Sequence, residues 1–311
     1  MGLWRPFVRS LLVVCGRILS FLLSCIPEAF IWCGSSFCAV ILFDVFRFRR
    51  KIILKNLEIV FPDLTHQEKH KIARRSLGKL VYNFYEFCLF PVIDDSWIQD
   101  HTEFLGLENL DKALMKNKGV LLLSLHLGHG DMAISMLAHK GYSLNVISKH
   151  FKMKWLNDFW FGARKRFGAN FMDPHGKNSS FDILRCLKKN QMIIFVLDQY
   201  MGPPYGIKTH FFGKPTGTAY GLALFSIKTG APVVPIWSYR NKEGKNIIEV
   251  GMEISTIIKS TREDSLLATT QSYNSILEHI IQKHPDDWMW IHRRWKKFRS
   301  DLPENSIENS L

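Results

Sequence analysis

Short apolar runs alternate with amphipathic stretches from residue 106 onward, and this pattern constrains the fold more than any other feature of the chain. The runs expected to be strands cover residues 120–125, 144–148, 192–197, 232–239 and 247–252. The stretches with helical periodicity cover residues 131–140, 157–167, 179–189, 218–229 and 263–284. Apolar strands that alternate with helices are typical of a mostly parallel sheet covered on both faces. We therefore predict an α/β fold whose functional residues lie at the carboxyl ends of the strands.

The N-terminal region is long and apolar enough to associate with a membrane. Between Ile18 and Phe43 the only charged residue is Glu28, which follows Pro27. A membrane span needs about 20 apolar residues, so one kinked span and a hairpin of two shorter segments both fit. The stretch FRFRRKIILK follows at residues 46–55. Basic and aromatic residues of this kind are expected where a chain leaves the bilayer on the cytoplasmic side.

Charge and cysteine content restrict the class of partner. The 311 residues carry a formal net charge of +13, which indicates an anionic partner such as nucleic acid, an acidic protein or a membrane surface. The preceding apolar segment favours the membrane, so we predict no nucleic-acid partner. The six cysteines include no C-x-x-C pair and match neither a zinc ribbon nor a disulfide framework.

These patterns divide the chain into four regions. We predict a membrane anchor at 1–45, a helical membrane-proximal region at 46–105, the α/β domain at 106–299 and a polar tail at 300–311. In the helical region, Thr65 and Glu68 form a capping-box pattern that predicts a helix from there to about Phe90.

The stretch HLGHGD, from His126 to Asp131, follows the first predicted strand of the α/β region and has three interpretations. As a metal site it is incomplete, because the remaining ligand positions of the H-x-H-x-D-H pattern fall on Leu127 and Met132. As a turn, it uses Asp131 as a helix N-cap. As a catalytic dyad, it needs the two glycines to let Asp131 fold back onto His126, which then takes a proton from a hydroxyl. We predict no metal, and the other two interpretations are compatible.

Several further motifs occur in a fixed order after this stretch. They are the block Arg164–Gly168, the pair Asp198-Gln199, the stretch Phe211–Pro215, the stretch Gly230–Pro235 and the block Pro285–Lys296. With H-x-x-x-x-D, these motifs resemble those of bacterial lipid A biosynthesis late acyltransferases, within the glycerolipid acyltransferase superfamily, over residues 47–299. One departure is that His129-Gly130 stands where the family often has Asn-Trp.

The resemblance implies an enzyme that transfers a fatty acyl group from an acyl carrier protein or coenzyme A thioester to a hydroxyl of a lipid A precursor. It implies no cofactor, and it places the enzyme at the bacterial inner membrane with the catalytic domain facing the cytoplasm. The expected partners are acyl carrier protein, a membrane glycolipid acceptor and the anionic membrane surface. The alternatives are another acceptor, such as a phosphatidylinositol mannoside or a lysophospholipid, and a non-catalytic basic membrane adaptor.

The resemblance also implies roles for individual residues. His126 is the expected general base with Asp131 as its orienting partner, and the expected oxyanion donors are Arg164 and then Arg166. Asp198 and Gln199 are expected to line the site or to position Arg164. The expected wall for the acyl chain is Phe211, Phe212 and Gly213. The expected contacts to the membrane or to an anionic partner are Arg47, Arg49, Arg50, Arg293, Arg294, Lys296, Lys297 and Arg299. The side chains of Trp288, Trp290 and Trp295 are expected either at the membrane interface or in the protein core.

Overall fold

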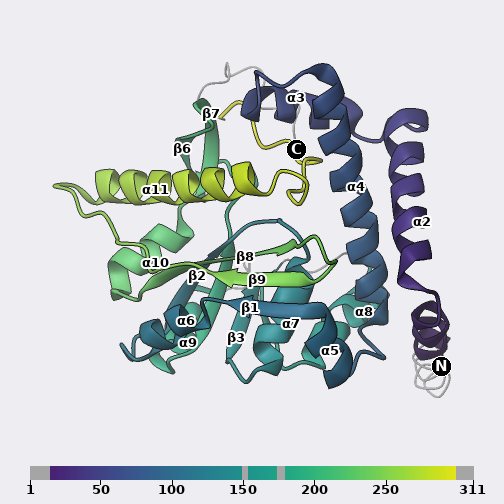
Figure 1. The fold of residues 1–311 in the computed structure, drawn as a ribbon. Helices are drawn as coiled ribbons and strands as arrows, with labels where there is room; N and C mark the ends of the chain where they lie inside the picture. Colours follow the sequence, from purple (N-terminus) through teal and green to yellow (C-terminus); the bar gives the residue numbers. More distant parts are fainter. Residues whose placement is uncertain (1–14, 149–152, 174–178, 299–311) are drawn as a thin grey trace, which may run out of the picture.

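A seven-stranded sheet forms the centre of the molecule (Figure 1). The computed structural model describes residues 15–148, 153–173 and 179–298. The strands lie in the order β1-β9-β8-β2-β5-β3-β4. Their bounds are β1 Thr102–Leu105, β2 Val120–Ser124, β3 Leu144–Ile147, β4 Asn170–Met172, β5 Met192–Val196, β8 Val233–Arg240 and β9 Asn246–Val250. Only the β8–β9 pair is antiparallel, so the prediction of a mostly parallel α/β sheet is confirmed.

Helices cover both faces of this sheet because the central strand is apolar on both sides. Leu121 and Leu123 of β2 belong to one core cluster, and Val120 and Leu122 belong to the other. The first cluster is covered by α9 (Ser179–Lys188), α10 (Gly221–Thr229) and α11 (Arg262–Lys283). The second is covered by α5 (Asp95–His101), α6 (Leu107–Leu114) and α7 (Gly130–His139), with α8 (Lys154–Lys165) beside them.

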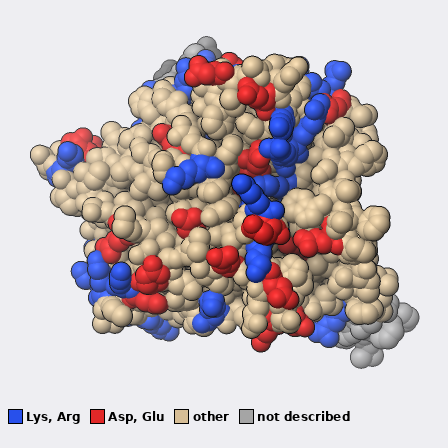
Figure 2. All heavy atoms as spheres, in the orientation of Figure 1, with Lys and Arg blue, Asp and Glu red and all other residues tan. Residues whose placement is uncertain are grey.

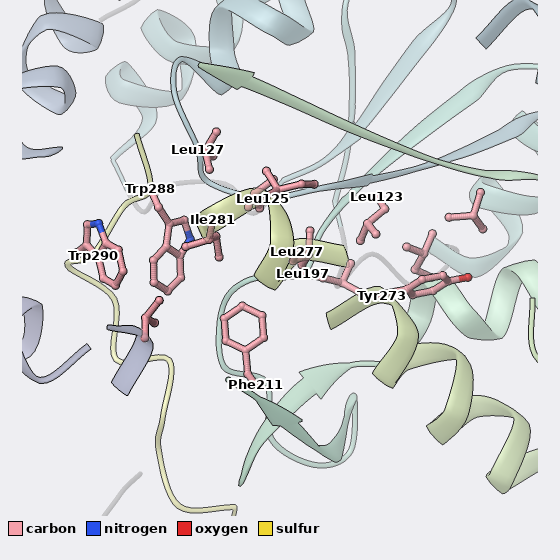
Figure 3. Packing of buried hydrophobic residues seen from close by; sticks show 14 of the residues in the cluster. Leu123, Leu125, Leu127, Leu197, Phe211, Tyr273, Leu277, Ile281, Trp288 and Trp290 are labelled. Carbon is pink, nitrogen blue, oxygen red and sulfur yellow. The ribbon is translucent and has the colours of Figure 1, made fainter. Parts of the chain in front are cut away.

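The first core continues beyond the end of β2. Figure 3 shows Leu123, Leu125 and Leu127 in a row above α11, with Trp288 below Leu127. Trp288 and Trp290 are both 1% exposed, so they are core residues and not membrane-interface residues.

A hairpin interrupts the alternation of strands and helices. It consists of β6 (Gly206–Phe211) and β7 (Lys214–Ala219), and it packs against α11. The sequence pattern predicts a helix from Thr218, but Thr218 pairs with Ile207 in the hairpin, and α10 begins only at Gly221. The Thr218 hydroxyl accepts a hydrogen bond from buried Asn274, which holds this residue in the hairpin.

A long helix, α4 (His66–Leu89), connects the sheet to the N-terminal helices. The predicted capping box is confirmed, because the Thr65 hydroxyl accepts from the Glu68 backbone and the Glu68 carboxylate accepts from the Thr65 backbone. The shorter helix α3 (Arg50–Val60) precedes it. Asn56 of α3 donates to the carbonyls of Trp290 and His292, at 2.8 and 2.7 Å, and so ties this region to the C-terminal segment.

The apolar N-terminal region runs along the outer side of α4 (Figure 1). A helical stretch at Cys15–Ser24 ends before Pro27, and α2 (Glu28–Val40) then continues into the π-helical turn η1 (Ile41–Val45). Within the described residues, Glu28–Val45 is the one helical segment long and apolar enough to cross a membrane, with a mean hydropathy of 1.6. Its inner side packs on α4, where Trp32 stacks on Tyr82 at 4.0 Å between ring centroids.

Candidate active site

The turn that joins β2 to α7 carries His126 and is held in place by the C-terminal segment. The His126 carbonyl accepts from the Met289 backbone at 3.0 Å, and the Gly128 backbone donates to the Asp287 carbonyl at 2.9 Å. Leu127 forms an isolated antiparallel bridge with Trp288. The stretch HLGHGD and the block Pro285–Lys296 therefore form one structural unit, although more than 150 positions separate them in the sequence.

Gly128 is required by the geometry of this turn. Its φ is +61°, and a Cβ there would lie 2.1 Å from the Ser238 carbonyl oxygen. Any larger residue would push the turn away from β8 and displace His126 from the sheet edge.

Asp198 is the carboxylate that holds His126. It follows β5, the neighbour of β2 in the sheet, and is 1% exposed. Its Oδ1 lies 2.8 Å from His126 Nδ1, and its Oδ2 accepts from the His126 backbone at 3.1 Å and from Trp288 Nε1 at 2.8 Å. Because an ionised carboxylate only accepts hydrogen bonds, Nδ1 carries the imidazole proton and Nε2 keeps a lone pair.

Asp131 makes a different contact from the one expected from the sequence. Its Oδ1 accepts from Nη2 of Arg164 on α8, and Asp198 makes the hydrogen bond to the imidazole. We therefore correct the expectation that Asp131 folds back to hydrogen-bond with His126. Asp198, expected to line the site or to position Arg164, bonds to His126 and not to Arg164. Asp131 stays close enough for its charge to raise the pKa of His126.

His129 caps α7, a role that we had expected for Asp131. Its Nδ1 accepts from the Met132 backbone at 3.2 Å, and its side chain is 3% exposed. Burial, with the nearby charges of Arg240 and Arg164, lowers the pKa of His129 to about 3. His129 is thus a neutral residue that begins a helix.

The two members of the His126–Asp198 pair have shifted pKa values. Burial acts to lower the pKa of His126, but the charge and hydrogen bond of Asp198, with the charge of Asp131, raise it above 6.5. Burial acts to raise the pKa of Asp198, yet His126 and the Trp288 hydrogen bond bring it down to about 2. Asp198 is therefore ionised at neutral pH and stabilises the imidazolium form of His126.

Gln199 and His292 complete the surroundings of the imidazole. Gln199 Nε2 lies 3.1 Å from His126 Nε2 and 3.0 Å from His292 Nε2. Since an amide nitrogen is a donor, these contacts match a His126 whose Nε2 lone pair is available. Sequence reasoning did not assign roles to His292 or to the Trp288 indole. Their only signal was membership in the C-terminal block.

Arg164 has the properties of a buried donor. It is 7% exposed and lies over the rings of Trp160 and Phe171, at 5.1 and 5.5 Å. Within the described part of the chain, its Nε has no hydrogen-bond partner. Arg166, the second expected donor, instead bonds to the carbonyls of Phe90 and Ile93 and does not line the site.

Other residues expected at the site lie elsewhere. Phe211, Phe212 and Gly213 sit at the turn of the β6–β7 hairpin, outside the lining of the pocket that contains His126. Phe211 reaches the core from below in Figure 3. Arg294 is fully buried and donates to the Gln199 and Gly217 carbonyls at 2.9 and 2.6 Å. We therefore correct the expectation that Arg294 contacts an anionic partner, because its charge holds the site together from inside.

The remaining basic residues expected to meet an anionic partner are at or near the surface. Arg47, Arg49, Arg293, Lys296 and Lys297 are exposed. Arg50 is partly exposed and lies 3.6 Å from Asp44, and Arg299 falls outside the described residues.

The His126 side chain opens into a pocket of about 960 Å³ at the carboxyl edge of the sheet. This volume is at the upper end of the ~300–1,000 Å³ found for small-molecule sites. Its polar lining residues include Asp131, Arg164 and Gln199, and most of the wall is apolar. Such a site suits a long hydrocarbon chain with a polar reacting group.

Comparison with known proteins agrees with this geometry. A family model described as "Bacterial lipid A biosynthesis acyltransferase" matches residues 7–297. The chain belongs to this acyltransferase family. The family membership makes the protein an acyltransferase of lipid A biosynthesis, as the motifs predict.

The characterised relatives of this acyltransferase are distant. It is 23% identical to the lipid A biosynthesis lauroyltransferase of Escherichia coli, over 82% of this chain and 81% of the relative. It is 22% identical to a lipid A biosynthesis acyltransferase of Haemophilus influenzae, over 84% and 86%. It is also 23% identical to the phosphatidylinositol mannoside acyltransferase of Mycolicibacterium smegmatis, over 74% of each chain.

Proposed function

We propose that this acyltransferase moves a fatty acyl group from an acyl carrier protein or coenzyme A thioester to a hydroxyl of a lipid A precursor. His126 is the general base and Asp198 is the carboxylate that orients it. The observation that carries this proposal is the 2.8 Å contact between His126 Nδ1 and Asp198 Oδ1 at the wall of an apolar pocket. A buried carboxylate that fixes the tautomer of a histidine is the arrangement that general-base catalysis requires.

The reaction needs no nucleophile from the protein. The acceptor hydroxyl takes the place of the Gln199 amide at His126 Nε2 and loses its proton to that nitrogen as its oxygen attacks the thioester carbonyl. The tetrahedral intermediate collapses, the carbon–sulfur bond breaks, and the imidazolium returns the proton to the leaving thiolate. The products are an ester and a free thiol, so atoms and charges balance. Asp198 stabilises the imidazolium between the two proton transfers.

Arg164 is the donor best placed to stabilise the oxyanion. It lines the pocket beside His126, and its Nε has no partner within the described residues. Donors that face a developing charge in a site shielded from water contribute strongly to catalysis. Asp131 holds the guanidinium from the other side, so it acts on the reaction through Arg164 as well as through its own charge on His126.

The surface and the N-terminal helix support attachment to the inner membrane with the catalytic pocket on the cytoplasmic side. Figure 2 shows basic side chains gathered where the N-terminal half of α4 lies in Figure 1. Arg74 and Arg75 on this part of α4 are exposed and pair with Asp44 and Asp286, and Arg47 is exposed in the turn after the apolar helix. A cluster of cations beside an apolar helix suits the anionic head groups of a membrane, a phosphorylated acceptor and an acidic carrier protein.

A second acceptor class deserves a separate test. One relative is named as a phosphatidylinositol mannoside acyltransferase, and in this chain His129-Gly130 stands beside Asp131, where the family often has Asn-Trp. The chemistry at His126 would be the same with that acceptor, so only the acceptor-binding part of the pocket distinguishes the two functions.

Replacing His126 tests the proposed function. The variant His126→Ala is expected to lose about 10²–10⁴-fold of its acyl transfer rate, the usual contribution of a general base, and to keep its unfolding temperature. The matched control is His210→Ala, at an exposed histidine of β6 outside the pocket.

The measurement is transfer of labelled acyl chains in membranes, with mass spectrometry of total lipids to identify the acceptor. Full activity of His126→Ala would exclude the proposed base. If cells with and without the wild-type gene have the same lipid acylation, the result would favour a non-catalytic membrane adaptor.

A further inference from the structure

Gly130 is a glycine that the fold does not require. Unlike Gly128, it does not have a positive φ, and a Cβ at this position would meet no atom within 4 Å. It is the first residue of α7, where alanine is a better helix former by about 1 kcal/mol. Neither backbone conformation nor packing therefore requires a glycine here. The absence of a side chain leaves open space beside Asp131.

This space opens into the pocket that contains His126, along the part of its wall between α7 and α4, which we call the α4 arm. Gly130 and Ile134 lie one turn apart on the same face of α7 and line the pocket together. From α4 the lining includes the apolar residues Leu80, Phe84 and Phe87, together with Ser76, Lys79 and Asn83. Phe84 is 57% exposed, so its ring is available to a ligand.

The arm ends next to the polar centre of the site. Phe87 of α4 stacks on Trp160 of α8 at 4.2 Å between ring centroids. Arg164 lies over the same Trp160 ring and is bonded to Asp131. An apolar chain that lies along α4 and α7 therefore reaches the groups that surround His126.

A second apolar arm enters the same pocket on the opposite face of the sheet. Its walls include Phe195 of β5, Ile183 of α9, and Leu224 and Phe225 of α10. Phe195, Ile183 and Phe225 belong to the core cluster on that face, whereas Phe87, Ile134 and Trp160 belong to the other cluster. The two arms thus meet at the sheet edge where His126 lies.

We propose that the α4 arm, which Gly130 lines, binds a hydrocarbon chain of the acceptor lipid. Gly130 is then the position that determines which acceptors fit. This rests on the proposed function, in which both substrates carry hydrocarbon chains and two arms are needed. The α4 arm is assigned to the acceptor because α4 also packs against α2, the segment apolar enough to cross a membrane. A membrane lipid reaches this side directly, whereas the donor chain arrives on a water-soluble carrier and occupies the arm at α9 and α10.

The test is a graded series at Gly130, with Ala, Leu and Trp as replacements. The control is Gly162→Trp, which adds the same side chain to an exposed glycine of α8 that also has no atom within 4 Å and does not line the pocket. The acceptor probe is a phosphorylated glycolipid with long acyl chains, compared with the same glycolipid whose acyl chains have been shortened. The donor probe is a long-chain acyl thioester alone, whose slow hydrolysis by water reports binding on the donor side.

Gly130→Trp is expected to raise KM for the long-chain acceptor by about tenfold or more, the scale on which changes in pocket volume discriminate substrates. KM for the shortened acceptor and the rate of donor hydrolysis are expected to stay within about twofold. Leu is expected to give an intermediate effect. Binding of the long-chain glycolipid to His126→Ala with and without Gly130→Trp provides the same comparison without turnover.

Two results would overturn the inference. If Gly130→Trp slows donor hydrolysis and leaves KM for the acceptor unchanged, the arm holds the donor chain. If neither changes in a folded variant, the arm binds neither substrate. A wild-type protein that transfers no acyl group to any lipid would instead contradict the proposed function, whatever the Gly130 series shows.

Discussion

The residue that orients His126 comes from the neighbouring strand and not from the same turn. Asp198 makes three hydrogen bonds around His126 and Trp288, whereas Asp131 acts on the imidazole by charge alone and bonds to Arg164. Asp198 and Asp131 therefore affect the pKa of His126 in different ways, and the pH dependence of kcat/KM in variants of each carboxylate distinguishes the two effects.

Asp198→Asn is expected to lower the pKa of His126 and to reduce kcat by about 10²–10⁴-fold. In the wild type kcat/KM rises with pH as His126 loses its proton, with a midpoint above 6.5 because the His126 pKa is raised. Without the Asp198 charge, the lowering effect of burial dominates, so the midpoint moves to lower pH. Asp131→Asn is expected to move the midpoint in the same direction but less, since its charge contributes less to the shift.

The measurement is the pH profile of kcat/KM for both variants, with thermal unfolding to confirm that each is folded. A larger shift of the midpoint in Asp131→Asn than in Asp198→Asn would make Asp131 the principal partner of His126, as the H-x-x-x-x-D pattern alone suggests.

A buried charge cluster joins α4 to the β8–β9 hairpin. Glu86 of α4 is ion-paired with Arg240 and accepts from Asn246 at 3.2 Å. The Arg240 guanidinium also lies 4.5 Å from the centre of the Tyr82 ring and 5.4 Å from that of Trp32 on α2. One residue thus links the sheet, α4 and the apolar N-terminal helix, and His129 at the start of α7 lies 3.9 Å from the same carboxylate.

Arg240→Ala is expected to destabilise the protein by about 3–5 kcal/mol, because it leaves the Glu86 carboxylate buried without its cation. The double variant Glu86→Gln with Arg240→Met is expected to cost clearly less, since no charge then remains unpaired. The measurement is denaturant unfolding in detergent solution.

The control for this experiment is Lys116→Ala, which breaks the exposed pair with Glu253 and is expected to change stability by about 1 kcal/mol or less. An effect of Arg240→Ala no larger than this control would show that the cluster does not hold these elements together.

The outward side of the N-terminal helices exposes many large apolar side chains. Phe30, Phe37 and Val40 of α2 are 70%, 66% and 44% exposed, and Phe46 in the following turn is 73% exposed. Surfaces of this kind are rare on water-soluble monomers and mark contact with a membrane or a partner. The basic turn after η1, with exposed Arg47 and Arg49, would then contact the head groups of the membrane lipids.

Removing residues 1–45 is expected to shift the protein from the membrane fraction to the supernatant, with or without detergent. A milder variant replaces Phe30 and Phe37 by Ser and leaves Trp32 and Glu28 packed against Tyr82. Each lost phenylalanine contact with lipid removes about 1.5–3 kcal/mol of apolar burial, so extraction at high pH and high salt is expected to release more of this variant than of the wild type.

Flotation of the protein with anionic vesicles measures the attachment that remains. Quantitative binding of the truncated protein would place the main membrane contact on the basic surface of the rest of the chain.

Elements whose signals are local could be predicted from the amino-acid sequence. The apolar runs became β2, β5 and β8 because a strand buried on both faces must be apolar throughout. The capping box at Thr65 and the break at Pro27 depend on residues within one turn of a helix. The family also follows from sequence, since ordered motifs need no knowledge of strand order.

The contacts between side chains of the site depend on how elements distant in the chain pack together, so they became visible only in the structure. Asp198 reaches His126 because β5 lies next to β2, and the pattern of either strand contains no information about its neighbour. Arg294 is buried and donates to the Gln199 and Gly217 carbonyls because the segment after α11 packs against the β6–β7 hairpin. The run of basic residues in the sequence does not predict this packing. The capping contact of His129 and the open space beside Gly130 likewise became visible only in the structure. The contacts of Asp198 and Arg294 join segments that are distant in the chain, so the periodicity of a single segment does not predict them.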